Sequence, residues 1–345
     1  MNFVFPNEEW EIADENKRGW SISHLNKAES IYQSFPSSSL MIIDHGYLIA
    51  AWGDLDKKIK ISSVRKSILA TLFGILLQET PFDLDASLAD LKLDDEPSLS
   101  NIEKQASIRQ ILQSRSGVYH DYVGGSPRMR LDQPKPGAHL PGTHWYYNNW
   151  DFNCAGALFE KIFSTSIADA FIKYLAKPLE MQDFNKEDFY YFPERYPKPG
   201  QAPSLFPAYH FRMTTRDMAR LACLYSAGGC WQGKQIVPES WMQEMTRVYS
   251  SAFSKICPVK NSGYGYFWWI NSWLDIIEPN YSAKGNLGKY IIVFPKKKLA
   301  IICQVHVEAP DDSKQETAKS YSRFASIPDS KMSTLLNILL AAYPK

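Results

Sequence analysis

The chain has 345 residues, of which 45% are hydrophobic and 22% are charged, so it can bury a large core and is neither disordered nor fibrous. The 38 lysines and arginines nearly balance the 37 aspartates and glutamates, which gives a net charge of +1. This balance argues against a partner chosen by bulk charge, so we expect no nucleic acid partner.

At the N-terminus, the first residues lack the basic and apolar regions of a secretory signal. The sequence as it stands therefore predicts a cytoplasmic protein, or a periplasmic or secreted one if a signal has been removed. Residues 39–43 and 47–52 are apolar and strand-like, and the turn sequence Asp44-His45-Gly46 separates them. This pattern predicts a β-hairpin.

Residues 66–78 lack proline and are rich in leucine, isoleucine and alanine, which predicts a buried helix with start signals at Ser62 and Ser63. Its most apolar part, 68–77, is too short to cross a bilayer, which requires about 20 residues. We therefore expect no membrane span. Further helical patterns follow at 108–113, 153–163, 167–175 and 215–227. Loops rich in proline and glycine interrupt them at 124–142 and 191–207, and these loops are long enough to suggest a functional role.

Strand patterns return near the C-terminus, at 265–270, 289–294 and 299–307, and a final helix is predicted at 331–343. These elements predict an α+β fold, in which an antiparallel sheet from both chain ends is flanked by helices and carries a mainly helical inserted lobe. We expect 1–345 to form a single unit, with an α/β lobe from 1–78 and 210–345 and a helical lobe from 79–209. The two lobes should meet along a cleft.

The sequence Ser63-Val-Arg-Lys66 is the first candidate for chemistry. A helix brings residues three apart to the same face, so the lysine amine could reach the serine hydroxyl. A desolvated lysine with a lowered pKa can remove the hydroxyl proton and so create a nucleophile. The alternative is a serine helix cap followed by a solvated lysine.

The sequence Trp145-Tyr-Tyr-Asn-Asn149 is the second candidate. A tyrosine there could act as a base or a proton relay, and an asparagine amide could orient a substrate carbonyl. Two registers fit the pattern Tyr-x-Asn: Tyr146 with Asn148, and Tyr147 with Asn149. The alternative is an aromatic loop packed on the core.

Taken together, these motifs resemble those of the serine β-lactamase and penicillin-binding-protein superfamily, and most of all its class C β-lactamase-like branch, which includes esterases and peptidases. The resemblance rests on Ser63-x-x-Lys66, on Tyr147-x-Asn149 with Gly156 nine residues after the tyrosine, and on a glycine strand motif near the C-terminus. It covers about 35–310. The glycine spacing favours the register of Tyr147 and Asn149.

The resemblance implies a β-lactamase/transpeptidase-like fold, with the whole chain as one catalytic unit, and a role for each matched residue. Ser63 would attack an acyl carbonyl and form an acyl-enzyme, and Lys66 and Tyr147 would share the roles of base and acid. Asn149 would hold a small ester, amide or peptide-like substrate. The rival functions are a D,D-peptidase or β-lactamase acting on cell-wall-type substrates, and a non-catalytic relative that only binds a ligand.

The third motif departs from the family pattern. Within Ser282-Ala-Lys-Gly-Asn-Leu-Gly288, aligning Gly285 on the motif glycine places Ala283 where β-lactamases have a basic residue. Asn286 and Ser63 would supply the two oxyanion N–H groups. Without a cation at position 283, the carboxylate of a β-lactam lacks its partner, so esters or amides are favoured. Lys284 could replace that cation if it turned inward, but adjacent strand residues point to opposite faces, which favours a solvent-facing lysine.

A Ser/His/Asp triad is the main competing arrangement. The chain has no Gly-x-Ser-x-Gly elbow, and we expect His120, His144 and His210 to lie at the rim of the cleft. No histidine pair or acidic cluster has metal-ligand spacing, so we expect no metal and no cofactor. The five cysteines lack Cys-x-x-Cys pairs and are predicted to be free thiols. The sequence does not specify an oligomeric state.

Overall fold

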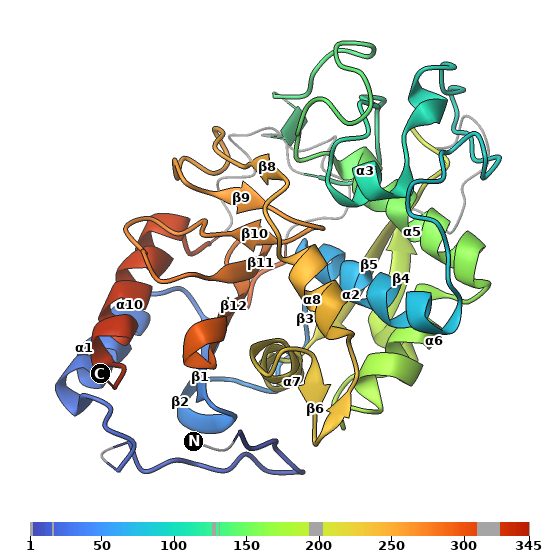
Figure 1. Cartoon of the computed structure of the whole chain (residues 1–345). Helices are drawn as coiled ribbons and strands as arrows, with labels where there is room; N and C mark the ends of the chain where they lie inside the picture. The colour runs from blue at the N-terminus through green and yellow to red at the C-terminus, as the bar shows by residue number, and fades with distance from the viewer. Residues whose placement is uncertain are drawn as a thin grey trace.

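A computed structural model of the chain describes residues 3–15, 17–125, 129–130, 132–192, 203–308 and 325–344 (Figure 1). Parts of the two predicted loops, 126–128, 131 and 193–202, lie outside the described residues. The main sheet has the strand order β2-β1-β13-β12-β11-β10-β9-β8. Its strands are β1 Ser38–Asp44, β2 Tyr47–Gly53, β8 Ser250–Ser251, β9 Gly263–Tyr264, β10 Trp269–Ile270, β11 Tyr281–Gly285, β12 Lys289–Phe294 and β13 Leu299–Val305.

Smaller strands and the helices complete the described elements. A three-stranded sheet has the order β3-β5-β4, and β6 and β7 form a hairpin. These strands are β3 Ile59–Lys60, β4 Phe189–Phe192, β5 Ala208–Met213, β6 Cys230–Trp231 and β7 Lys234–Gln235. The α-helices are α1 Ile22–Tyr32, α2 Val64–Glu79, α3 Ile108–Leu112, α5 Asn149–Phe163, α6 Ile167–Phe171, α7 Thr215–Ser226, α8 Glu239–Met245 and α10 Asp329–Ala342. The short helices are η1 Glu103–Gln105, η2 Ile172–Ala176, η3 Lys186–Asp188 and η4 Pro295–Lys297.

The sheet joins the two ends of the chain. Strand β1 pairs antiparallel with β13, with Ser38 opposite Val305, and with β2 across the turn at His45, which has a φ of 52°. The predicted α+β class, with an antiparallel sheet from both chain ends, is therefore confirmed. The predicted strand 265–270 is wrong in detail, because only its last two residues form a strand, β10, and a turn containing Phe267, at a φ of 59°, separates β10 from β9.

Both faces of the sheet are covered by helices, which explains why its central strands are apolar throughout. All residues of β12 are buried, as expected for a strand with helices on both faces. Ile291 and Val293 face the core that contains α2 and α7, while Tyr290 and Ile292 face the core that contains α1 and α10. Figure 1 shows α10 and α1 together on one side, with α2 and α7 on the other. Helix α2 thus lies against the sheet with its N-terminus near β11.

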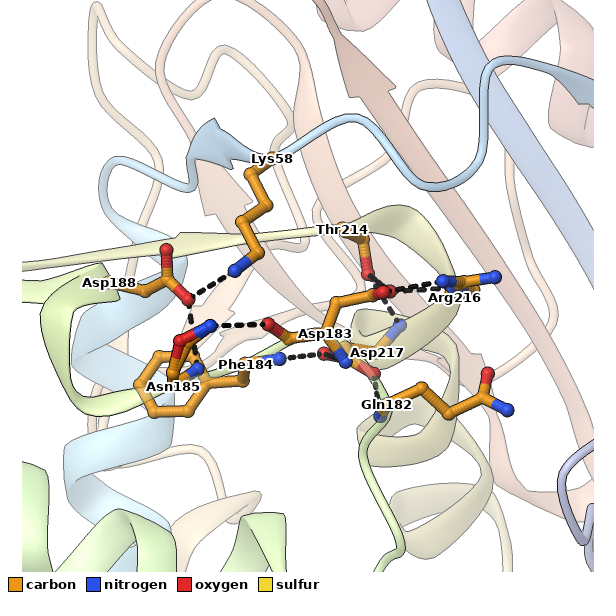
Figure 2. A network of polar contacts seen from close by, with 9 residues as sticks. All are labelled: Lys58, Gln182, Asp183, Phe184, Asn185, Asp188, Thr214, Arg216 and Asp217. Atoms are coloured by element: carbon orange, nitrogen blue, oxygen red, sulfur yellow. Dashed lines mark hydrogen bonds and ion pairs between the residues drawn. The ribbon is translucent and has the colours of Figure 1, made fainter.

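A network of polar contacts fixes the start of α7 to the segment before η3 (Figure 2). The carboxylate of Asp217 accepts the backbone N–H groups of 182–184, at 2.8–3.2 Å. Asp183 in turn accepts hydrogen bonds from Arg216, at 2.6 Å, and from Thr214, at 2.7 Å. The network therefore connects the region of β4 and β5 to a helix that packs on the main sheet.

Replacing Asp217 with alanine should lower the free energy of unfolding by about 2–4 kcal/mol, because it removes a buried carboxylate and leaves three part-buried backbone donors without an acceptor. Urea denaturation measures this loss. The matched control is Lys58→Ala, since Lys58 belongs to the same network but forms a part-exposed ion pair with Asp188. Such a pair contributes about 1 kcal/mol or less. Equal effects of the two substitutions would contradict the assignment of Asp217 as the central acceptor.

Candidate active site

Ser63 lies at the N-terminus of α2, in the wall of a cleft. The residue before it, Ser62, has a φ of 53°, in the left-handed region that residues with a side chain rarely occupy. Strained backbone of this kind clusters at functional sites, where the surrounding structure holds it in place. Here the preceding Ile61 is held by a hydrogen bond from its N–H to the carbonyl of Phe211, at 3.0 Å. The half-buried Ser63 hydroxyl is therefore presented at a fixed position.

Lys66 lies one turn further along α2, and its amine reaches both predicted partners. Its Nζ lies 3.1 Å from Oγ of Ser63 and 3.0 Å from Oη of Tyr147. The side chain is only 2% exposed, and Nζ also lies 3.8 Å from the centre of the Phe152 ring. Burial, assisted by the positive charge of Arg65, lowers the pKa of Lys66 well below its ordinary value. The neutral amine, which can accept a proton, is therefore favoured.

Tyr147 comes from the loop that leads into α5, and its pKa is shifted in the opposite direction from that of Lys66. Burial raises the pKa of Tyr147 to about 12, although a hydrogen bond with Ser63 and the charge of Arg65 oppose this shift. The ring packs against Phe152 and Trp269, with centroid distances of 4.8 and 5.1 Å. The hydroxyl therefore stays protonated at neutral pH and can donate a proton.

The two possible registers of the Tyr-x-Asn motif can be compared in the structure, because the residues beside Tyr147 lie in different places. The hydroxyl of Tyr146 donates to the carbonyl of Met129. Asn148 caps α5 by accepting the N–H of Trp150 at 3.2 Å. Asn149 instead lines the cleft, where its Nδ2 donates to the carbonyl of Val123 at 3.2 Å. The structure thus brings Tyr147 and Asn149 to the cleft together with Ser63.

The third motif lies across the cleft, on β11. The backbone of Gly285 passes so close to Ile61 that a Cβ on the glycine would lie 2.4 Å from the carbonyl oxygen of Ile61. Only a residue without a side chain fits there. Ala283 is buried in the core, whereas the next residue after the glycine, Asn286, is exposed and lines the cleft. Strand β11 therefore contacts the segment that carries Ser63.

Lys284 points to the face opposite Ala283, as strand alternation predicts, but it is not a solvent-facing lysine. Its side chain is 10% exposed and forms an ion pair with Asp329, at 2.8 Å. The amine also donates to the carbonyl of Ser272, at 2.9 Å, and lies 3.6 Å from the centre of the Trp273 ring. The first residue of α10 therefore holds this lysine at the edge of the cleft.

The cleft has a volume of about 760 Å³, within the range of small-molecule sites. A second hollow of about 570 Å³ adjoins it and shares Tyr147 and Met129 as lining residues. Its wall includes four further aromatic side chains, Trp145, Tyr146, Tyr249 and Phe253. Together they leave room for an apolar substituent beside the Ser63 hydroxyl.

The histidines lie at or away from the cleft. His120 pairs with Glu103, at 3.2 Å, and His144 stacks on His139. His210 lines the cleft, and burial lowers its pKa well below the ordinary value, which keeps the ring neutral. Within the described ranges, no hydrogen bond joins Ser63 to a histidine, and no group of three potential metal ligands occurs. The described helices include none that could span a membrane.

Comparison with known proteins places the chain in a family. A family model described as Beta-lactamase matches residues 25–322. The chain belongs to the beta-lactamase family. The similarity to the serine β-lactamase and penicillin-binding-protein superfamily that the motifs indicated is thereby confirmed, and the family is one of hydrolases.

Solved structures show the same fold at low sequence identity. A candidate beta-lactamase from Bacteroides dorei superimposes with a TM-score of 0.66 at 16% identity, over 94% of this chain and 99% of that one. A candidate 6-aminohexanoate-dimer hydrolase from Bacillus anthracis gives 0.67 at 15% identity, over 98% and 87%. An octameric penicillin-binding protein homologue from Pyrococcus abyssi gives 0.63 at 18% identity, over 96% and 78%.

Proposed function

We propose that this member of the beta-lactamase family is a serine hydrolase that forms an acyl-enzyme on Ser63. The observation that supports this most directly is the convergence of three side chains, with the Lys66 amine 3.1 Å from the Ser63 hydroxyl and 3.0 Å from that of Tyr147. A nucleophile, a buried amine and a protonated phenol within hydrogen-bond distance form a path for one proton.

In the acylation step, Oγ of Ser63 attacks the substrate carbonyl and gives its proton to the neutral amine of Lys66. The Tyr147 hydroxyl donates its proton to the leaving group and takes one back from the Lys66 ammonium. The backbone N–H groups of Ser63 and Asn286 would stabilise the oxyanion, because both residues line the cleft from opposite sides. Deacylation repeats these steps with water as the nucleophile. The opposite pKa shifts of Lys66 and Tyr147 favour the lysine as base and the tyrosine as acid.

We infer that the substrates are esters or amides, positioned by the side chain of Asn149. The family's third motif supplies a cation for a carboxylate, but here Ala283 occupies that position, buried and without charge. Lys284, the nearest cation along the strand, is already paired with Asp329. On β11 a β-lactam carboxylate would therefore meet no unpaired cation, which makes β-lactams less favoured substrates than esters or amides.

A fluorophosphonate probe tests this function. The wild type should add one probe, and peptide mass spectrometry should locate it on Ser63. Ser63→Ala should remove all labelling, whereas the matched control Ser62→Ala should keep it. Labelling that persists in Ser63→Ala would contradict the proposal. A non-catalytic relative would instead take up an ester's acyl group in a burst without further turnover.

A further inference from the structure

Arg65 is a buried cation in the wall of the same cleft, and the proposed acylation step does not use it. Its side chain is 3% exposed, and its guanidinium carbon lies 4.5 Å from the centre of the Tyr209 ring. It comes two residues after Ser63, in the same first turn of α2, and it lines the cleft. A substrate whose carbonyl lies at Ser63 would therefore extend toward this side chain.

The guanidinium of Arg65 contacts the Tyr209 ring but lacks part of the hydrogen bonding that a buried charge requires. Its Nη1 is buried and has no hydrogen-bond partner, and no carboxylate of the described residues forms an ion pair with it. Arginine does not lose its proton in proteins, so it cannot escape this cost by becoming neutral. An unpaired buried charge is strongly destabilising. The geometry thus leaves an interaction that a ligand can complete.

Two other arginines, the buried Arg220 and the half-buried Arg18, have acceptors at the end of the side chain, although Nε of Arg220 also lacks a partner. Arg220 is 0% exposed, and its guanidinium donates to the carbonyls of Leu179, at 2.9 Å, and of Asn7. Arg18 forms an ion pair with Asp44, at 3.1 Å. Arg65 therefore differs from them in position, at the cleft, and in lacking a protein acceptor for Nη1.

The charges around the cleft point to the same kind of ligand. Its described lining residues include Lys60, Arg65, Lys255 and Lys284, and among them Asp329 is the one acid. That carboxylate is held by Lys284, at 2.8 Å, and Lys255 pairs with Asp132 of the adjoining hollow, at 2.7 Å. The cleft thus carries a net positive charge and attracts an anion.

We propose that Arg65 binds a carboxylate of the substrate, so that the enzyme prefers esters or amides that carry a free carboxylate a few bonds from the reacting carbonyl. This inference rests on the proposed function. The planar guanidinium matches a carboxylate in geometry and can donate two parallel hydrogen bonds to it. The positive charge that binds the carboxylate thus comes from Arg65 on α2, and not from position 283, where the family has its basic residue.

Two pairs of matched esters test this proposal, each differing by one carboxylate. In one pair, 4-nitrophenyl hydrogen glutarate and 4-nitrophenyl valerate, the charge lies on the acyl group; in the other, 4-carboxyphenyl acetate and phenyl acetate, it lies on the leaving group. The wild type should prefer the carboxylate in at least one pair by about tenfold or more in kcat/KM, as expected for charge-assisted hydrogen bonds. Arg65→Gln should abolish that preference, and Arg65→Lys should retain part of it.

The measured quantity is the ratio of kcat/KM between the two esters of a pair. This ratio is needed because Arg65 also lowers the pKa of Lys66, so that replacing Arg65 will affect every substrate. Lys186→Gln is the control: it makes the same change of charge away from the cleft, on a side chain that is 61% exposed, and should leave the ratio unchanged. A wild type without preference, or an Arg65→Gln variant that slows both esters equally, would overturn the proposal. Failure of the acyl-enzyme mechanism would appear separately, as hydrolysis by Ser63→Ala.

Discussion

Replacing Lys66 with methionine should slow covalent labelling of Ser63 by about 10²–10⁴-fold, the usual contribution of a positioned general base. Methionine fills a similar volume but offers no lone pair of comparable basicity to the Ser63 hydroxyl. The rate of fluorophosphonate labelling measures the effect. The matched control is Lys289→Met, because Lys289 is also fully buried but donates to the carbonyl of Val307, outside the cleft.

The pH dependence of labelling should separate these two lysines. Labelling of the wild type should rise with pH as Lys66 loses its proton, with a midpoint well below the ordinary lysine value of 10.5, since burial lowers the pKa of Lys66. Tyr147, with a pKa of about 12, should stay protonated over the same range. Lys66→Met should lose this rising limb, whereas Lys289→Met should keep it. A rising limb that survives in Lys66→Met would contradict the role of the amine as base.

Replacing Lys66 should change stability in the direction opposite to activity. Between the lowered folded pKa of Lys66 and 10.5, the unfolded chain binds a proton at this lysine that the folded chain does not bind. Stability therefore falls as the pH is lowered through this window. Lys66→Met removes that cost, so its free energy of unfolding at neutral pH should equal or exceed that of the wild type. Slow labelling by a stable variant would exclude misfolding as the cause.

The parts of the fold that the sequence predicted are those with long, uninterrupted patterns. Strand β1 of the hairpin, the apolar helix α2 and the strands β12 and β13 all bury continuous runs of residues. Helix α1 was not predicted, because only Leu25 and Ala28 of its residues are buried and the pattern is weak. Helix α5 begins at Asn149, four residues before its predicted start, since the cap at Asn148 lies inside the tyrosine motif.

Contacts within the site could be predicted from the sequence only between residues that lie close together along the chain. Ser63 and Lys66 are one helical turn apart, so their contact follows from α2 alone. The position of Lys284 depends on Asp329, which lies 45 residues further along the chain at the start of α10. The unpartnered Nη1 of Arg65 becomes visible only when every neighbour is placed.

Replacing Gly285 with alanine should reduce kcat/KM by about 10²-fold and the free energy of unfolding by about 1–3 kcal/mol. The added Cβ would lie 2.4 Å from the carbonyl oxygen of Ile61, which is backbone and cannot rotate away. That oxygen also accepts the N–H of Val64, at 3.3 Å, in the turn that presents Ser63. Relief of the clash must therefore shift the nucleophile relative to the cleft.

A substitution at a second glycine, Gly229, is the control that distinguishes a loss of stability from a loss of Ser63 positioning. At Gly229, in the loop between α7 and β6, a Cβ would also lie 2.4 Å from a backbone oxygen, that of Val237. Gly229→Ala adds strain from a φ of 84° and should cost at least as much stability, measured by urea denaturation. Because Gly229 does not line the cleft, the kcat/KM of its folded fraction should match the wild type. Equal activity in both variants would mean that the contact of β11 with Ile61 supports the fold but does not position Ser63.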